Sequence, residues 1–359
     1  MNLKQVLKTM VQHDASDLYL RTKAIPKARI DGEVKNLGEE VILKSDMEKV
    51  TNMLLATDDR RMKFRENLDI DFVHEDPDCG RFRVNIFTQR GTPAIVMRYV
   101  KSDIQSFEEL NLPIEILKLF CEETRGIFLV CGPAGNGKST TIASMIEYIN
   151  TISSKHIVTI EDPIEFLFKD KKSIINQREL EIDVTSYPSA LKHVTQQSPD
   201  IIYIGNIRDR DTMQAAVTAT ELGTFVITTL HTVNAIQTLM RVINFFPPHM
   251  HDEIRNQLSV ILRGTLSLRL LKRKDDQGRI PAYETMVVTP TIARLIRENK
   301  INEIQKYIDE GELFGMQSFK SCMVKHVKAG LVTEEEARQY ADSKDDFNLA
   351  LKGLKRYTD

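Results

Sequence analysis

The chain has 359 residues, and its 49 lysines and arginines nearly balance 51 aspartates and glutamates, for a formal charge of −2. At roughly 150 residues per domain, this length predicts two or three domains. Hydrophobic residues make up 42% and charged residues 28%, which argues against disorder, and the balanced charge argues against bulk binding to nucleic acid. The apolar run at 127–131 is far shorter than the about 20 residues of a membrane span. The start of the chain lacks an apolar signal core, so we expect a cytoplasmic protein.

Residues 1–100 form the first predicted domain. The segments 70–73, 81–87 and 94–99 predict strands, and loops rich in Asp, Pro and Gly separate them. The pair Asp31-Gly32 lies near apolar alternations and predicts a hairpin turn. Together these patterns favour a small α+β domain.

Residues 101–115 are predicted to be a linker. Ser106 and Glu109 match a capping box there, and Pro113 interrupts the pattern soon afterwards.

Residues 116–290 alternate short apolar runs with helical sequence. The runs are rich in β-branched and aromatic residues and lie at 127–131, 157–160, 201–204 and 225–228. Strands that are apolar on both faces and separated by helices predict a parallel sheet covered on both sides, hence an α/β domain. Residues 291–359 are predicted to be a mostly helical C-terminal region.

Residues 132–140 fit the phosphate-binding pattern G-x-x-x-x-G-K-[ST], the Walker A motif, or P-loop. A buried strand is predicted before them and a helix after them, which is the context that the motif needs and which a mere glycine-rich turn lacks. Backbone N–H groups of such a loop wrap phosphates, Lys138 is expected to reach the β- and γ-phosphates, and the Ser139 hydroxyl is expected to bind Mg²⁺. The candidate nucleotide-binding residues of this loop are Gly132, Pro133, Ala134, Gly135, Asn136, Gly137, Lys138, Ser139 and Thr140.

Glu161 and Asn206 follow two of the other predicted strands. Carboxylates at the carboxyl end of a parallel strand point toward the crevice where nucleotides bind, so Glu161 is a candidate general base; the alternative is a solvated loop acid. Asn206 stands where an acidic residue normally ends a Walker B strand. An amide can offer its oxygen to Mg²⁺ or to water, but it cannot take up a proton. Hydrolysis must therefore depend on Glu161, be slow, or be absent.

His231 ends the next predicted strand and is a candidate sensor of the γ-phosphate, although a lone histidine is more often structural. Arg81 and Arg83 share one face of a predicted strand, and Arg98 lies on another. Surface arginines are usually solvated, but these three are also candidate arginine fingers, delivered by a neighbouring domain or subunit.

In this order the motifs resemble those of the secretion-type hexameric ATPases, and within them the type IV pilus retraction ATPases of the PilT/PilU family. The matches are the P-loop, the acidic segment 161–165, the strand end at 205–209 and the histidine box at 229–232. Further matches lie at 15–18, 30–32 and 80–85 in the first domain, and at 289–290, 295–297 and 315–319 near the C-terminus. The chain lacks the four-cysteine module of assembly and secretion members, which favours the retraction branch. Residues 245–247 and 341–349 look more like PilU than PilT.

The resemblance implies a PAS-like N-terminal domain, a flexible linker and a RecA-like ATPase domain that uses ATP and Mg²⁺. Carried over by motif, Glu161 is the acidic-box glutamate, His231 is the histidine-box residue, and Arg81, Arg83 and Arg98 are the arginines of the N-terminal domain. The family glutamate at the Walker B position is replaced here by Asn206.

The resemblance also implies partners: a homohexamer, a PilT ring, and an inner-membrane platform protein through which the protein associates peripherally with the membrane. A DNA-processing RecA-like ATPase is the least favoured function, because the charge is balanced and the sequence shows no aromatic, basic stripe for strand binding. Three other functions stay open on the sequence. The chain is a motor or accessory motor for pilus retraction and twitching motility, a low-turnover structural subunit coupled to an active PilT ring, or a type II secretion or pilus assembly ATPase.

Overall fold

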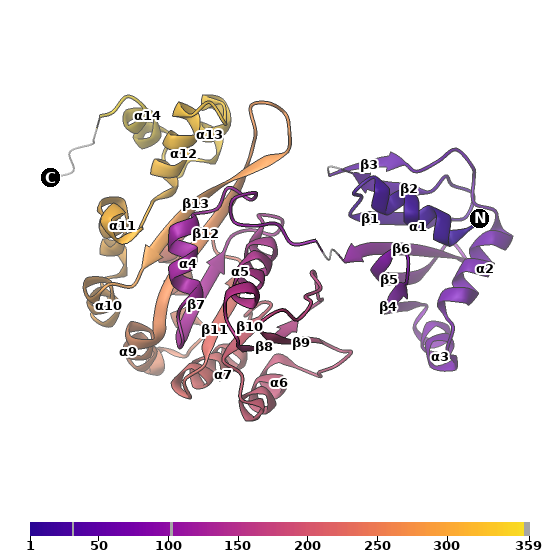
Figure 1. The fold of residues 1–359 in the computed structure, drawn as a ribbon, viewed down its shortest axis with the longest axis horizontal. Coiled ribbons are helices and arrows are strands. Elements are labelled where there is room, and N and C mark those ends of the chain that lie inside the picture. The colour runs from indigo at the N-terminus through magenta and orange to yellow at the C-terminus, as the bar shows by residue number, and fades with distance from the viewer. Residues whose placement is uncertain (31, 101–102, 355–359) are drawn as a thin grey trace. The chain divides into compact units, whose positions relative to one another are not determined.

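The computed structural model describes residues 1–30, 32–100 and 103–354. Its chain divides into two compact units, residues 1–103 and 104–359 (Figure 1). Asp31 of the predicted hairpin turn, and residues 101–102 of the predicted linker, lie outside the described residues. Within the described ranges, the structure holds no helix of the length and apolarity that a bilayer crossing requires.

The first unit is a six-stranded antiparallel sheet with three helices. The strands lie in the order β3-β2-β1-β6-β5-β4, and the predicted α+β class is confirmed. The elements are α1 (Leu3–Gln12), β1 (Asp17–Arg21), β2 (Lys27–Ile30), β3 (Glu33–Asn36), α2 (Lys44–Leu54), α3 (Asp58–Asn67), β4 (Asp69–Asp76), β5 (Gly80–Gln89) and β6 (Thr92–Val100).

The two faces of this sheet differ because side chains alternate along each strand. Phe82, Val84 and Ile86 of β5 are fully buried and belong to one core with apolar residues of α1 and α2. Arg81 and Arg83 stand at alternate positions with these residues and therefore lie on the other face. The sequence alternation therefore decides which face carries the core and which carries the arginines.

The predicted capping box lies near the start of the second unit. The backbone N–H of Ser106 donates to Glu109 Oε2 at 2.7 Å, and the backbone N–H of Glu109 donates to Ser106 Oγ at 3.2 Å. The reciprocal bonds form as predicted, but they close a turn, and the next helix, α4 (Ile114–Cys121), begins directly after Pro113.

The second unit is built on a seven-stranded sheet in the order β13-β12-β7-β11-β10-β8-β9. Every neighbouring pair is parallel except β12 and β13, so the predicted parallel α/β core is confirmed. Its elements are α4, β7 (Gly126–Cys131), α5 (Lys138–Ile152), β8 (His156–Glu161), β9 (Ile174–Glu179), α6 (Tyr187–Val194), η1 (Thr195–Gln197), β10 (Ile201–Ile204), α7 (Arg210–Glu221), β11 (Phe225–Leu230), α8 (Ala235–Asn244), η2 (Pro248–Met250), α9 (His251–Ile261), β12 (Leu262–Lys272) and β13 (Arg279–Val287).

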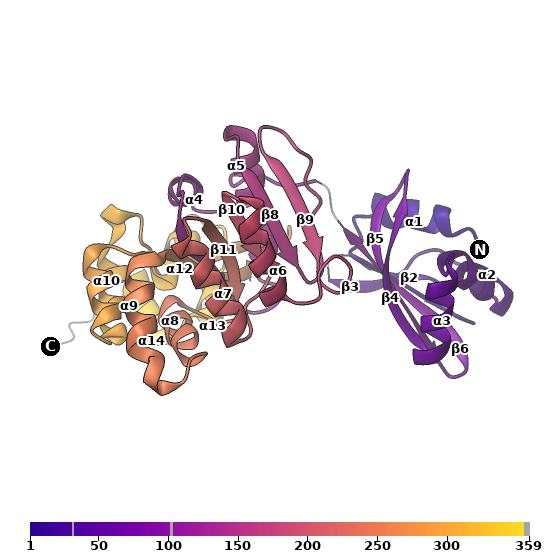
Figure 2. The same cartoon turned by 90° about the horizontal axis from the view of Figure 1, so that it is seen from below.

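Helices cover both faces of this sheet (Figures 1 and 2). One core joins α4 and α5 to one face, and a second core joins α6, α7, α8 and α9 to the other. Strands β7, β10 and β11 are accordingly buried on both sides, which is why they read as continuous apolar runs in the sequence.

The C-terminal region is helical, as predicted, with α10 (Pro290–Arg297), η3 (Ile301–Glu303), α11 (Ile304–Glu310), η4 (Glu312–Phe314), α12 (Phe319–Lys328), α13 (Glu334–Tyr340) and α14 (Lys344–Leu351). Helices α12, α13 and α14 share a core with Leu271 of β12 and with Ile280 and Ala282 of β13. These three helices, residues 319–351, are called the C-terminal cap below.

Candidate nucleotide-binding site

Four polar segments meet at one edge of the second sheet. The parallel strands β7, β8, β10 and β11 are neighbours in the order β7-β11-β10-β8, so their carboxyl ends lie side by side. The P-loop follows β7, Glu161 ends β8, Asn206 follows β10, and His231 follows β11. This edge is where open α/β sheets bind their ligands.

The P-loop has a backbone that its glycines permit. Gly132, Gly135 and Gly137 have φ angles of +146°, +76° and +83°. A Cβ at Gly132 would also lie 2.7 Å from the backbone oxygen of Leu268, so a larger residue would collide with β12. The loop leads into α5, which begins at Lys138, so the free N–H groups of the helix N-terminus face the same edge.

Two long-range contacts hold the loop in this shape. Asn136 Oδ1 accepts a hydrogen bond from the backbone N–H of Leu270 at 2.9 Å, and its Nδ2 donates to the Pro133 and Ala134 carbonyls at 3.4 and 3.3 Å. Arg279 Nη1 donates to the Gly135 carbonyl at 3.3 Å. Asn136 was predicted to bind nucleotide; the structure shows its side chain fastening the loop to β12.

The side chain of Lys138 lies folded against its own loop. Its Nζ donates to the backbone oxygens of Gly132 at 2.8 Å and Pro133 at 3.0 Å, and it lies 3.3 Å from His231 Nδ1. An ammonium group only donates, so Nδ1 accepts and the neutral His231 carries its proton on Nε2. Burial, Lys138 and Arg208 lower the pKa of His231, and burial lowers that of Lys138. Residues predicted from two separate motifs are thus in direct contact.

Glu161 is buried, with 5% of its surface exposed. The Thr159 hydroxyl donates to its Oε1 at 2.7 Å, and Gln177 Nε2 donates to the same oxygen at 3.3 Å. Burial raises the pKa of the Glu161 carboxyl to about 7, although Thr159 and Gln177 favour the charged form. A carboxyl with a pKa near neutrality can take up and release a proton at physiological pH.

A small cavity of about 10 Å³ adjoins Glu161. Ser139 of α5 and Tyr203 of β10 line it together with Glu161, and the rings of Phe166 and Phe168 lie around them. The volume is close to that of one water molecule. The predicted Mg²⁺ ligand Ser139 and the predicted base Glu161 therefore border one space.

Thr159, Gln177 and Tyr203 belong to the site, but the sequence reasoning did not select them. Thr159 and Tyr203 are register partners on β8 and β10, and both lie within runs that read as apolar core. Gln177 lies on β9, after the long loop that follows the acidic segment. A polar side chain inside an otherwise apolar strand was the sequence signal that could have identified Thr159 and Tyr203.

Asn206 differs from Glu161 in its surroundings. Only 9% of its surface is exposed, and within the part of the chain that the structure describes neither Oδ1 nor Nδ2 has a hydrogen-bond partner. A buried polar group without a partner costs about 1–3 kcal/mol, so its presence calls for an explanation. Its place at the ligand-binding edge of the sheet fits a group that is paired by a bound ligand or by water.

The residues at this edge suit a magnesium–nucleotide complex better than a free metal ion. Ser139 and the neighbouring carboxyl and amide groups provide oxygen ligands, which Mg²⁺ prefers, and Mg²⁺ keeps several waters and phosphate oxygens. In the described ranges no group of three or more His, Cys, Asp and Glu residues could hold a metal by itself. The nucleotide would therefore have to supply most of the coordination.

The three predicted arginines share one face of the first unit. Arg83 on β5 is the direct register partner of Arg98 on β6, and Arg81 lies two residues before Arg83. Arg98 Nε donates to the buried Asp17 at 2.9 Å, and Arg98 keeps 65% of its side chain exposed. Nitrogen–oxygen distances of 3.7 Å to Glu75 and 3.9 Å to Asp71 place Arg81 and Arg83 in looser ion pairs.

The fold and this edge define a P-loop nucleotide-binding protein. Residues 1–339 match the family model described as type II/IV secretion system protein, and the chain belongs to that family. It is 38% identical to the type IV pilus retraction ATPase PilT of Pseudomonas aeruginosa, over 97% of this chain and 100% of that protein. It is 35% identical to the type IV pilus ATPase PilU of the same organism, over 98% of this chain and 92% of that one.

A solved structure agrees with these likenesses. The crystal structure of the pilus retraction motor PilT with bound ADP superposes with a TM-score of 0.88 at 39% identity, covering 96% of this chain and 98% of that one. The predicted family and fold class are therefore confirmed. The closer likeness to PilU than to PilT stays a prediction, since the two identities are similar.

Proposed function

We propose that this chain binds ATP with Mg²⁺ and hydrolyses it as a motor, or accessory motor, for type IV pilus retraction and twitching motility. The observation that carries the proposal is the meeting of the P-loop, the buried Glu161 and the Lys138–His231 contact at one sheet edge. The full-length similarity to PilT and PilU supports the same role.

For Lys138 to bind a nucleotide phosphate, its ammonium group must first give up its present hydrogen bonds. Its ammonium group is now bonded to two loop carbonyls and to His231, and a β- or γ-phosphate would be a stronger, charged acceptor. The movement of Lys138 toward phosphate would release His231 Nδ1. That nitrogen would then be free to respond to the γ-phosphate, which is the role predicted for His231.

Hydrolysis would use Glu161 as the group that orients or deprotonates the attacking water. Its carboxyl lies beside a cavity of about one water's size, and its second oxygen, Oε2, is not the atom that Thr159 and Gln177 hold. Ser139 would supply an oxygen ligand to Mg²⁺, which when bound neutralises charge on the phosphates. Asn206 would hold the water or a phosphate oxygen through its amide, without taking a proton.

The arginine cluster of the first unit would complete the site. Arg81, Arg83 and Arg98 present guanidinium groups on one sheet face, and Arg98 is well exposed. In a homohexamer, such groups from a neighbouring domain or subunit would neutralise charge in the transferring phosphoryl group. Loss of the γ-phosphate would release them, and the ring would turn a platform protein at the inner face of the inner membrane. A PilT ring is a further proposed partner, whereas nucleic acid is not.

The low-turnover alternative has its own observation, the amide at Asn206. If the acid normally found there is needed for turnover, the chain would be a nucleotide-binding subunit whose work depends on an active PilT ring. The similarity to retraction ATPases over the whole chain makes a secretion or assembly ATPase the less favoured function.

The test is a Lys138→Ala variant of the full chain. We expect ATP affinity to fall about a hundredfold or more, because the variant loses the cationic contact to two phosphates. If the chain is a motor, a host strain that carries the variant should lose pilus retraction. If it is an accessory motor, the strain should lose the contribution that the chain makes to retraction by PilT. Unchanged ATP affinity together with normal retraction would refute the proposal. Binding without phosphate release by the unmodified protein would favour the low-turnover subunit.

A further inference from the structure

The loop that carries His231 is hydrogen-bonded to side chains of two strands, β12 and β13, which contain none of the sequence motifs described above. Arg269 of β12 donates through Nη2 to the backbone oxygen of Val233 at 3.4 Å. Glu284 of β13 accepts from the backbone N–H of Ala235, the first residue of α8, at 2.9 Å. Residues 231–234, called the histidine loop below, thus have one end bonded to Arg269 and the following helix bonded to Glu284.

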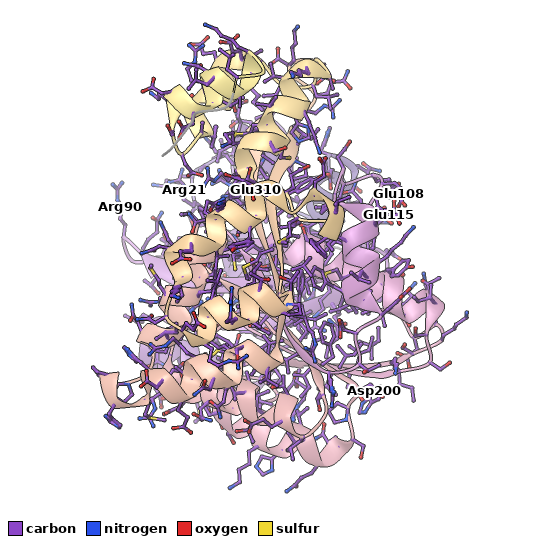
Figure 3. All side chains as sticks on the ribbon, turned by 90° about the vertical axis from the view of Figure 1, so that its left-hand side faces the viewer. Arg21, Arg90, Glu108, Glu115, Asp200 and Glu310 are labelled. Carbon is purple, nitrogen blue, oxygen red and sulfur yellow. The ribbon has the colours of Figure 1, made fainter. Side chains whose placement is uncertain are left out.

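The same arginine also binds the C-terminal cap. Arg269 Nη1 donates to the backbone oxygen of Tyr340 at 2.7 Å, and Nη2 pairs with Asp342 Oδ1 at 2.7 Å. Tyr340 is the last residue of α13, and Asp342 lies between α13 and α14. The guanidinium carbon lies 3.8 Å from the ring centroid of Phe319, the first residue of α12. Figure 3 shows these helices in yellow at one end of the second unit.

Arg269 is almost fully buried, with 8% of its surface exposed, whereas its partner Asp342 keeps 60% of its side chain exposed. Its guanidinium is a rigid plane, and its Nη2 serves both Val233 and Asp342. A shift of the histidine loop by about 1 Å would stretch the Val233 bond beyond hydrogen-bonding distance unless the guanidinium followed. If the guanidinium moves, its contacts with Tyr340, Asp342 and Phe319 must change as well.

We propose that Arg269 is a positioning residue that couples the histidine loop to the C-terminal cap. The nucleotide-dependent part of this inference rests on the proposed function, in which Lys138 leaves His231 and binds a phosphate of the nucleotide. Through Arg269 the cap then responds to the occupancy of the site. Linkage makes this effect reciprocal: if nucleotide binding favours one position of the cap, a partner that holds the cap in that position strengthens nucleotide binding by the same factor.

Glu284 holds the start of α8, which directly follows the histidine loop, in place. Its carboxyl is buried and accepts from the N-terminus of α8, where an acceptor is favoured by the helix dipole. The first turn of α8 is also fixed, since Thr238 Oγ1 donates to the Asn234 carbonyl at 2.7 Å and lies 2.6 Å from Thr232 Oγ1. With the start of α8 held, movement of the histidine loop falls on the Val233–Arg269 bond.

The experiment compares Asp342→Ala with Asn348→Ala in the full chain. Asp342 has an exposed side chain and removing it takes away one of the cap-side partners of Arg269. Asn348 is the matched control, because its Oδ1 accepts from Arg338 Nε at 3.1 Å and joins α13 to α14 without touching Arg269. Arg269→Lys is a third variant, which keeps the charge and loses the planar fork.

The measurement is amide hydrogen exchange with and without a non-hydrolysable ATP analogue, together with the kinetics of phosphate release. In the unmodified chain we expect the analogue to slow exchange at 132–140, at 231–236 and at 340–351. In Asp342→Ala we expect the slowing at 340–351 to be lost, and the affinity for the analogue to fall about threefold to tenfold, which phosphate release should report as a higher KM. Asn348→Ala is expected to keep both properties.

Retained slowing at 340–351 in Asp342→Ala, or its absence in the unmodified chain when 132–140 is protected, would overturn the coupling. No protection at 132–140 would instead refute the proposed function. In that case faster exchange at 231–236 without nucleotide, in Asp342→Ala but not in Asn348→Ala, still supports the positioning role of Arg269. Equal exchange in both variants would leave Arg269 as a structural tie of the cap alone and would overturn the inference.

Discussion

The ends of β8 and β10 lie side by side at the candidate site, yet their polar residues have opposite surroundings. The Glu161 carboxyl accepts from Thr159 and Gln177, while the Asn206 amide has no hydrogen-bond partner among the described residues. A partnered group is held in one orientation before any ligand arrives, whereas an unpartnered one gains its bonds only with a ligand. We therefore expect Glu161 at the end of β8 to take part in hydrolysis, and Asn206 after β10 to contact the bound ligand.

The largest expected effect is that of Glu161→Gln on turnover. Glutamine keeps the shape and most of the hydrogen bonds but cannot accept a proton, so kcat should fall by about 10² or more while ATP affinity changes little. Phosphate release and nucleotide binding are the measurements. Glu165→Gln is the matched control, because Glu165 is exposed in the same acidic segment. Equal losses in the two variants would remove the special role of β8.

Asn206→Glu tests the β10 side of the comparison. The change adds a proton acceptor beside Glu161, and if the amide limits turnover, phosphate release should rise about tenfold. The companion variant Asn206→Leu removes the unpaired amide. It should keep or raise the free energy of unfolding while lowering ATP affinity, because the unpaired group costs stability until a ligand meets it. A loss of stability with unchanged affinity would show that Asn206 is structural.

The pH dependence of stability should reveal the buried carboxyls. Burial raises the pKa values of Glu161 and Glu284 to about 7, against 4.5 for an ordinary glutamate. Between these values the folded protein holds protons that the unfolded chain has released. Each carboxyl therefore adds stability that is full at low pH and declines, by at most about 1.4 kcal/mol per pH unit, until it is lost above about pH 7.

Urea unfolding between about pH 5 and 8 measures this slope. Glu161→Gln should reduce it, and adding Glu284→Gln should reduce it further. A slope that neither variant changes would mean that both carboxyls titrate normally in the folded protein.

The smallest expected effect is that of Thr159→Val. The nearly isosteric change removes one donor to the Glu161 carboxylate, so the pKa of Glu161 should rise and the acidic limb of the rate profile should shift to higher pH. The maximal rate should fall only severalfold. An unshifted limb would show that the Thr159 hydroxyl does not influence the protonation of Glu161, which burial, Gln177 and the backbone of Glu165 would then control.

Part of this site was predictable because its signals are local. The P-loop, Glu161, Asn206 and His231 each follow a buried strand within a few residues, and parallel strands bring such ends to one edge. The face shared by Arg81 and Arg83 likewise follows from the alternation of side chains along one strand. The fold class and the sheet edge where these residues lie could therefore be inferred from spacing and residue type, whereas the family was inferred from the resemblance of the motifs to known ones.

The remaining contacts join residues that are distant in the chain. Asn136 meets the backbone of Leu270 across 134 residues, and Arg269 meets Asp342 across 73. No local pattern records such meetings, since they depend on strand order and on where the C-terminal helices pack. The reciprocal bonds of Ser106 and Glu109 show the same limit, because the predicted pair forms but closes only a turn.

The sequence by itself thus determined the buried strands β7, β8, β10 and β11, the P-loop and the residue types that end these strands, since periodicity and glycine spacing act over a few residues. It did not mark β9, β12 or β13 as strands of the same sheet. Only the tertiary structure decided that Lys138 rests on His231, that Glu161 is buried beside Ser139 and Tyr203, and that Arg269 ties the histidine loop to the C-terminal cap. Hydrogen bonding and burial depend on which segments are neighbours in space, and the order of the seven strands in the sheet decides which segments those are.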